Sequence, residues 1–554
     1  PSGGATLGSI ASATISIEDE MTEDFPALLE IISGDQQSGF PGDMLEPFVL
    51  SVKEQGDLAA ARDVSWRVEP AGAGRLIDGQ VTRSDDAGLA RNSLEILEGG
   101  VITVIATVGE QSVASRADDD TPNTVRFTVN AGFAGTADLT PNQRAVGGAL
   151  DKACLALENK TERSAAEADL LATCDKLQAG TAGDIKSGLN RLQPEEVFAI
   201  GTLSLDTADL QVTNVQSRIN AIRLGSHGFD LSGLELQLYG QTIPGYVSNA
   251  ILDAVNGGGA GDDEGEPSRF GAFVNGTVSV GKLDRSDREM GLDFDNQSVT
   301  AGVDYRINDS VVVGGSLGVT RHQGDYSSEG GGIELKSTSL SAFATWYDED
   351  DIYVDAILHY GSSKFDIERR INLDGEAAQF ARGKPDATEF ALSLGAGLEY
   401  ASGSWTYGPY GRLSFSSVDV DAYDESASDP QSPGFGSVLS VRSQSIDSSS
   451  IVLGGHVSRA ISTAGGVYLP QARLELEHRF SDSAREVEAS FRYDPEKNLF
   501  AIDSENVDTD YLNLGLGGSA VFRNGRSAFV FYETRLGQDR LTQNWFKVGV
   551  RFEF

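Results

Sequence analysis

The chain has 554 residues, a formal net charge of −40 and 64 glycines. Its length suggests several domains, and so acidic a chain is a poor partner for nucleic acid, whose phosphates require a positive surface. A hydrophobic content of 40% excludes wholesale disorder, and two cysteines exclude a disulfide-rich scaffold and a zinc site of four cysteines.

The amino-terminal region shows neither a signal peptide nor a membrane helix. No apolar run approaches the ~18 residues that a membrane helix needs. The chain opens at Pro1 without a Met or a basic start, so we expect that a leader was removed or that the chain belongs to a longer precursor. Residues 12–17 resemble residues 124–129, so residues 1–27 are either the end of a preceding repeat or a stray strand.

Residues 28–132 predict an immunoglobulin-like β-sandwich, with Trp66 as a candidate core residue. Seven short strands separated by turn residues are expected, at 28–32, 48–53, 64–68, 80–83, 93–96, 101–108 and 125–129. The stretches 32–42, 85–90 and 99–106 resemble the bacterial immunoglobulin-like repeats of invasin-type adhesins. That resemblance implies a spacer or adhesive module.

Residues 133–244 predict a helical junction. Apolar residues recur at helical spacing over 146–157, 162–177 and 210–224. Cys154 and Cys174 lie in the first two helices, so we expect a disulfide formed in an oxidising periplasmic or surface setting. The alternative is two buried free thiols.

Residues 245–269 predict a short helix followed by a linker. The helix is expected over 245–255, and the Gly-rich, acidic stretch 257–267 has the composition of a flexible linker.

Residues 270–554 predict a twelve-stranded antiparallel transmembrane β-barrel, so the chain as a whole is expected to be mainly β. Segments of about ten residues alternate apolar with polar or small side chains. Short connections alternate with long ones, as in barrels with tight periplasmic turns and large outer loops. The expected strands are 270–280, 297–306, 310–320, 337–347, 352–361, 388–400, 405–418, 447–460, 466–480, 511–522, 526–536 and 543–554.

Charged side chains on one face of the late strands predict a wet lumen. Charges on a strand face are costly in a dry sandwich core, but they are hydrated inside a barrel. The candidate lumen charges, expected to hydrate the pore and hold a threaded segment, are Arg473, Glu475, Glu477, Arg479, Glu533 and Arg535.

The carboxyl-terminal half resembles the translocator domain of type V autotransporters. Twelve alternating strands and an aromatic terminal strand carry the resemblance. It implies that the outer-membrane barrel assembly machinery reads the terminal strand, at Phe546, Val548, Val550, Phe552 and Phe554. It also implies a helix in the barrel lumen, with candidates Tyr246, Asn249, Asp253 and Asn256. Some family members cut that helix at Asn or Asp, but no spacing here singles out a cleavage centre.

No catalytic, metal or cofactor site is predicted. The stretches 314–318 and 515–520 match hydrolase and dinucleotide patterns loosely, but both lie inside predicted strands without a following helix. The five histidines lack metal-ligand spacing. The acidic stretches 118–120 and 419–425 lack the calcium-loop pattern, so solvated loops are expected.

The sequence therefore predicts a bacterial outer-membrane autotransporter that displays its immunoglobulin-like portion at the cell surface, as an adhesin does. Expected partners are outer-membrane lipid, the barrel assembly machinery, and either a surface ligand or further copies of the chain. Three alternatives stay open. The chain anchors a surface filament or layer, it translocates an enzyme encoded upstream, or it keeps its N-terminal domains in the periplasm.

Overall fold

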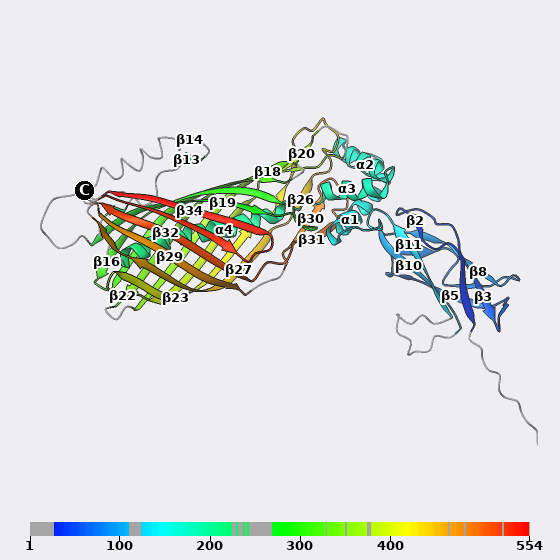
Figure 1. Ribbon diagram of the computed structural model, residues 1–554. Helices are drawn as coiled ribbons and strands as arrows, with labels where there is room; N and C mark the ends of the chain where they lie inside the picture. Colours follow the sequence, from blue (N-terminus) through cyan, green and yellow to red (C-terminus); the bar gives the residue numbers. More distant parts are fainter. Residues whose placement is uncertain are drawn as a thin grey trace, which may run out of the picture. The chain divides into compact units, whose positions relative to one another are not determined.

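The chain divides after Ala131 into two compact units, drawn in Figure 1. The computed structural model describes residues 27–109, 123–223, 229–230, 237–238, 241–242, 269–327, 330–348, 352–373, 378–463, 466–480, 484–522 and 526–552. Among these residues, no helix is both long enough and apolar enough to cross a membrane.

The first unit is a two-sheet β-sandwich. One sheet has the order β1-β3-β4 with β8 beside β3, and the other has the order β2-β11-β10-β5-β7. Their bounds, with those of the paired β6 and β9, are β1 (Leu28–Ser33), β2 (Gln37–Gly39), β3 (Phe48–Glu54), β4 (Asp57–Leu58), β5 (Asp63–Glu69), β6 (Gly74–Leu76), β7 (Val81–Arg83), β8 (Leu89–Asn92), β9 (Leu94–Ile96), β10 (Gly100–Val108) and β11 (Thr124–Ala131). The immunoglobulin-like class of this sandwich stays a prediction.

The sandwich core forms around Trp66. Its indole stacks on Phe127 with ring centroids 6.0 Å apart, and its Nε1 donates a 2.8 Å hydrogen bond to Thr82. Phe48 packs on the other side of Phe127. A buried tryptophan whose N–H has a partner fills this core without leaving a polar group unsatisfied.

Four helices open the second unit. They are α1 (Pro141–Glu158), α2 (Ala165–Gln178), α3 (Ala182–Leu192) and α4 (Val197–Arg223). The first three begin at capping boxes, with Thr140, Ser164 and Thr181 as N-caps. Cys154 of α1 and Cys174 of α2 form a disulfide. Helix α3 was not predicted, although Ile185, Leu189 and Leu192 recur at helical spacing and are buried; it is short and contains Gly183 and Gly188, which weaken a helical pattern.

The rest of the second unit is a closed barrel of twelve long antiparallel strands, and the predicted fold class is confirmed. Hydrogen bonds between the last strand and the first, with Val278 opposite Phe546, close the cylinder. The long strands are β15 (Phe270–Leu283), β16 (Leu292–Asn308), β17 (Val311–Tyr326), β18 (Gly331–Tyr347), β19 (Ile352–Arg370), β21 (Asp386–Leu398), β23 (Trp405–Val420), β27 (Gln444–Arg459), β29 (Gly466–Arg479), β32 (Asp510–Phe522), β33 (Arg526–Leu536) and β34 (Leu541–Phe552).

Short strands extend this sheet, and two others form a separate pair. They are β12 (Phe229–Asp230), parallel to β15, the pair β13 (Gln237–Leu238) and β14 (Gln241–Thr242), and β20 (Phe380–Gly383), β22 (Tyr400–Ser402), β25 (Ser426–Ala427) and β28 (Ile461–Thr463).

The barrel has an apolar outer band bounded by aromatic residues. Exposed leucines and valines project outward from its middle, including Leu317, Leu340, Leu413, Leu453, Leu476 and Val530. Exposed aromatic residues lie toward the short-turn end (Trp346, Trp405 and Tyr468) and toward the long-loop end (Tyr360, Phe390 and Phe480). An apolar belt between two aromatic girdles is typical of an outer-membrane barrel.

Several strands run further than predicted at the long-loop end. Strand β19 continues to Arg370, nine residues past its predicted end, and β17 continues to Tyr326. Beyond the apolar band the outward side chains become polar while the inward ones stay buried. The apolar-outside alternation that marked each strand therefore ends there, although the strand itself continues.

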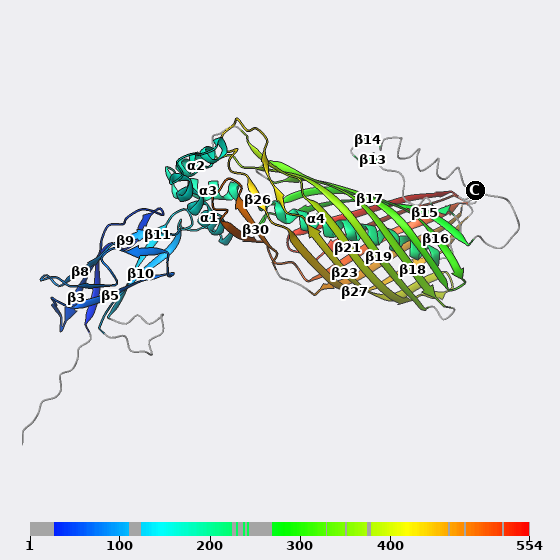
Figure 2. The same cartoon turned by 180° about the vertical axis from the view of Figure 1, so that it is seen from behind.

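Segments between the long strands build a second, smaller sheet at that end. Strands β24 (Tyr423–Asp424), β26 (Leu439–Val441), β30 (Glu486–Phe491) and β31 (Leu499–Asp503) pair in that order, and α1 packs against β30 and β31. Figure 2 shows this sheet between the barrel and helices α1–α3.

Candidate functional site: the helix-filled barrel lumen

Helix α4 lies inside the barrel, with its start at the long-loop end and its end at the short-turn end (Figures 1 and 2). It contacts β15 to β23. Thr207, Gln211, Asn214 and Arg218 follow one another at helical spacing and present a polar stripe to the wall. A helix with so much polar surface requires polar partners when it is buried.

The middle of this stripe bonds to hydroxyl groups on the inner face of the barrel. Gln211 donates to Ser298 (2.9 Å) and Thr320 (2.8 Å) and accepts from Thr300 (2.6 Å). Asn214 repeats the arrangement, donating to Ser298 and Thr300 and accepting from Thr277. Both amides have their donors and acceptors used, which fixes the rotation and the height of the helix.

A buried ion pair holds the next turn of α4. The Arg218 guanidinium donates two hydrogen bonds to Asp304 of β16, at 2.8 and 3.2 Å, and its side chain is 1% exposed. It also lies 5.6 Å from the ring centroid of Phe273. This bidentate geometry is the one in which a desolvated pair retains most of its attraction.

A second arginine holds the short-turn end of the helix. Arg223 donates to both carboxylate oxygens of Asp355, at 2.7 and 2.6 Å, and stacks on Tyr353. Asp355 also accepts hydrogen bonds from Thr345 and Gln216. Asp355 on β19 thus binds side chains from the last two turns of α4.

The half of α4 nearer the long loops is held by imidazole and amide side chains of the wall. Thr207 lies 2.9 Å from Nε2 of His322. Asp206 accepts hydrogen bonds from Asn296 and from Gln543 of the last strand, both at 2.9 Å. These contacts connect the helix to strands on both sides of the barrel closure.

Between its polar contacts, α4 packs an apolar stripe against the wall. Val215, Ile219 and Ile222 form one buried cluster with wall residues Phe273, Val312, Phe343 and Ile357. Gly318 lets the helix approach closely, because a Cβ at that position would lie 2.1 Å from Oε1 of Gln211.

The predicted lumen charges line the opposite wall, on β29 and β33. Arg473 pairs with Glu533, and Glu475 accepts a 2.7 Å hydrogen bond from Tyr410. Arg479 donates to Tyr511, Arg535 donates to Asn513, and Glu477 accepts from Asn513. They bond to one another and to other side chains of the wall, and among α4 side chains Asp209 is within electrostatic reach of Arg479 and Arg535.

A polar cavity of about 370 Å³ separates that wall from α4. Its lining includes Ser217, Arg223, Arg412, His456, Glu475 and Lys547. The helix therefore fills one side of the lumen and leaves an open space on the other.

At the lumen exit the helices α1–α3 are joined to the smaller sheet. Asn142 of α1 exchanges two hydrogen bonds with the backbone of Asp503, at 2.9 and 3.0 Å. Asp169 of α2 accepts from the amides of Gly434 and Gly436. Arg369 and Glu425 form a fully buried bidentate pair with both bonds at 2.7 Å.

Two buried glutamates lie just before α4. Burial raises the pKa of Glu195 to about 8, and the neighbouring Glu196 adds to the increase. Burial also raises the pKa of Glu196 to about 7. Arg285 and Glu289 face this pair and act on the Glu195 pKa in opposite directions. The exit therefore holds carboxyl groups that titrate near neutral pH.

The helix that the described residues place in the lumen is α4, and the predicted candidates for a lumen helix stay untested. The candidates Tyr246, Asn249, Asp253 and Asn256 lie outside the described residues, and the helix found in the lumen, α4, was partly predicted at 210–224 as part of the junction. Its partners lie on barrel strands much further along the chain, so no local pattern marks the polar stripe as one that faces a barrel wall. Of the predicted assembly signal, Phe546 is exposed on the outer surface, Val548, Val550 and Phe552 lie in β34, and Phe554 is outside the described residues.

Among the described residues, no group of three His, Cys, Asp or Glu side chains is arranged so that it could hold a metal ion. The site is instead a barrel wall fitted to a helix of the same chain. Residues 272–533 match the family model of the autotransporter beta-domain. This part of the chain is an autotransporter beta-domain.

The autotransporter beta-domain places the chain in the bacterial outer membrane and identifies the barrel as a translocator. The structure is similar to the translocator domain of the autotransporter NalP from Neisseria meningitidis (TM-score 0.41, 17% identity, 56% of this chain and 95% of that chain). It is also similar to the beta domain of the Bordetella autotransporter BrkA (TM-score 0.36, 18% identity, 52% and 100%).

One curated relative is an uncharacterized protein from the trpE–trpG intergenic region of Pseudomonas putida, which is 28% identical over 192 residues. The match covers 34% of this chain and 31% of the relative. The chain thus spans about a third of the length of that protein.

Proposed function

We propose that this autotransporter anchors its N-terminal β-sandwich in the outer membrane and displays it outside the cell as an adhesive or spacer module, without catalytic activity of its own. The observation that carries the proposal is α4. It leads the chain from the short-turn end through the lumen to helices α1–α3 at the long-loop end. Because long loops of such barrels face outward, the chain upstream of α4 emerges outside.

The contacts of α4 support an anchor rather than a transient passage. Its amide and arginine side chains form hydrogen bonds with wall residues, and α1–α3 are bonded to the smaller sheet at the exit. A segment that only passed through would gain nothing from so specific a fit. We infer that translocation ends with α4 in this position and that folding of the outer segments, without ATP, favours outward movement.

Protease access in intact cells tests the proposed topology. A specific protease site inserted between Thr161 and Glu162, in the exposed α1–α2 loop, is expected to be cut by protease added outside. The matched control is the same site in the short turn at Asn308–Asp309. That site is expected to resist cleavage until the outer membrane is permeabilised.

The opposite pattern, with the turn cut in intact cells and the α1–α2 loop protected, contradicts surface display. A periplasmic N-terminal portion would give protection at both positions until permeabilisation. Binding of the displayed sandwich to host or matrix molecules is then compared between cells with and without Pro1–Ala131, which tests the adhesive part of the proposal.

A further inference from the structure

Three neighbouring strands carry a basic cluster at the outer edge of the apolar band. On β17 the exposed Val319 is followed, one outward position further, by Arg321. On β18 and β19 the last exposed apolar side chains are Leu340 and Tyr360. On the outward face, the next position toward the long loops holds a hydroxyl residue and the one after it a lysine, Lys336 on β18 and Lys364 on β19. On each strand the outward side chains therefore change from apolar to basic.

The three cations are direct cross-strand neighbours. Arg321 lies opposite Lys336, and Lys336 lies opposite Lys364. Adjacent strands are about 4.8 Å apart, and like charges directly opposite one another destabilise a sheet. Glu334 offsets part of this repulsion, with ion-pair distances of 2.6 Å to Arg321 and 3.1 Å to Lys336. Among the described residues Lys364 forms no ion pair within 4 Å, although Asp386 lies opposite it on β21. The three cations and Glu334 together carry a positive charge.

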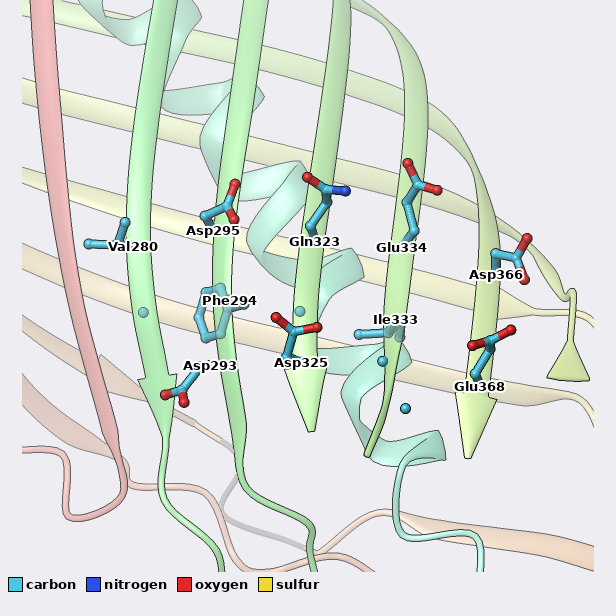
Figure 3. A pocket seen from close by; sticks show the side chains of 14 residues that line it. Val280, Asp293, Phe294, Asp295, Gln323, Asp325, Ile333, Glu334, Asp366 and Glu368 are labelled. Atoms are coloured by element: carbon cyan, nitrogen blue, oxygen red, sulfur yellow. The ribbon is translucent and has the colours of Figure 1, made fainter. Parts of the chain in front are cut away.

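Several other strands carry the opposite charge at this position, although β15 has a cation there, Lys282, which pairs with Asp284. On four other strands the first charged outward residue beyond the apolar band is an aspartate, namely Asp295, Asp386, Asp419 and Asp447. Further out, β16–β19 are acidic as well. Figure 3 shows Asp295, Glu334 and Asp366 along one level and Asp293, Asp325 and Glu368 along the next, around a shallow groove. On a chain of net charge −40, three neighbouring cations that share one carboxylate, Glu334, are an exception that favours an anion as partner.

We propose that Arg321, Lys336 and Lys364 bind the phosphate groups of lipid headgroups in the outer leaflet. The proposal rests on the outer-membrane location of the barrel. The apolar band sets the height of the acyl chains, so headgroup phosphates lie at the height of the cluster. Basic clusters next to a hydrophobic span are a recognised phosphate-lipid contact, and the guanidinium adds a planar fork that fits phosphate. The acidic levels above repel phosphate and limit it to this height.

Lipid binding by the purified full chain in detergent tests the proposal. The probe is lipid A carrying its phosphates, compared with the same lipid after dephosphorylation, and native mass spectrometry reports the bound fraction. The variant R321Q/K336Q/K364Q is expected to bind the phosphorylated lipid at least roughly tenfold more weakly than the unaltered protein. The matched control K282Q/R382Q/K384Q removes three exposed cations that already pair with Asp284, Glu368 and Asp366, and it is expected to keep full affinity.

Three results overturn the proposal: equal binding by the cluster variant and the unaltered protein, an equal loss in the control, or equal binding of dephosphorylated lipid. Displacement of the lipid by millimolar inorganic phosphate would assign the cluster to free phosphate instead. Heat-modifiable migration in gels confirms that each variant retains its barrel. Because binding is measured in detergent, its failure is distinguishable from a failure of surface display in the protease experiment.

Discussion

At the scale of single residues, the lumen depends on a few buried polar groups that are paired with one another. Arg218 and Asp304 are the clearest case, because both side chains are nearly inaccessible and each is the other's ionic partner. Removing one partner of such a pair leaves an uncompensated charge, whereas removing both does not.

We therefore expect Arg218→Leu to destabilise the barrel by about 3–5 kcal/mol and the double variant R218L/D304L to recover most of that loss. Denaturant unfolding of the barrel in lipid vesicles measures both. Lys384→Leu is the control, since it breaks an exposed pair with Asp366 and is expected to cost less than about 1 kcal/mol. If the single and double variants lose the same stability, the pair does not position α4.

The buried glutamates at the lumen exit give a pH dependence of definite sign. Glu195 has a folded-state pKa of about 8, above the ordinary 4.5. The folded state therefore binds the proton more tightly, so stability from this group is complete below about pH 4.5 and is lost as the pH rises toward 8. Glu196 acts in the same direction up to about pH 7.

Hydrogen exchange of α3 and the first turn of α4, corrected for intrinsic rates, is expected to show protection that falls as the pH rises from about 5 to 8. The variant E195Q/E196Q should remove most of this dependence and raise protection at the alkaline end. Glu162→Gln, in the exposed α1–α2 loop, should leave the profile unchanged. Protection that increases with pH would contradict the assignment.

At the scale of elements, α4 packs closely against β17 because position 318 is a glycine and has no side chain. Gln211 is held by three hydroxyl groups, so it has little room to yield to a Cβ at Gly318. Gly318→Val is expected to displace α4 from this wall and increase single-channel conductance in planar bilayers. Gly315→Val is the matched control on the same strand, where the nearest atom to a new Cβ lies 3.6 Å away. Equal conductance in the two variants would show that this contact does not seat the helix.

The elements differ in how far the sequence predicted them. Strand β34 was predictable because Phe546, Val548 and Val550 alternate with polar or small residues, and lipid on one side and lumen on the other impose that pattern. Helix α4 as a lumen element was not, because Gln211 and Asn214 have the spacing of an ordinary solvated face. Ser298 and Thr300 approach these two amides only in the folded chain. The lumen position of α4 therefore depends on a pairing between distant segments, which a local sequence pattern does not show.

At the scale of the whole molecule, the two units place their apolar side chains in opposite ways. The barrel turns its apolar side chains outward to lipid and its polar ones inward. The sandwich does the reverse, with Phe48, Trp66 and Phe127 buried between its sheets. Each arrangement is stable only in its own medium, so the chain must fold one unit in the membrane and the other in water.

The sandwich is therefore expected to fold alone. Residues 27–131 expressed without the barrel should be soluble without detergent, because the apolar core of this unit is completed by its own strands. Trp66 is the single tryptophan of this segment, so its fluorescence reports folding directly.

The urea midpoint of the fragment should equal that of the full chain carrying W346F/W405F/W545F, in which Trp66 alone reports. Phe127→Ala should lower both midpoints by an equivalent of about 3–5 kcal/mol. A fragment whose Trp66 emission is that of a solvent-exposed indole would show instead that the sandwich requires the barrel-bearing unit to fold.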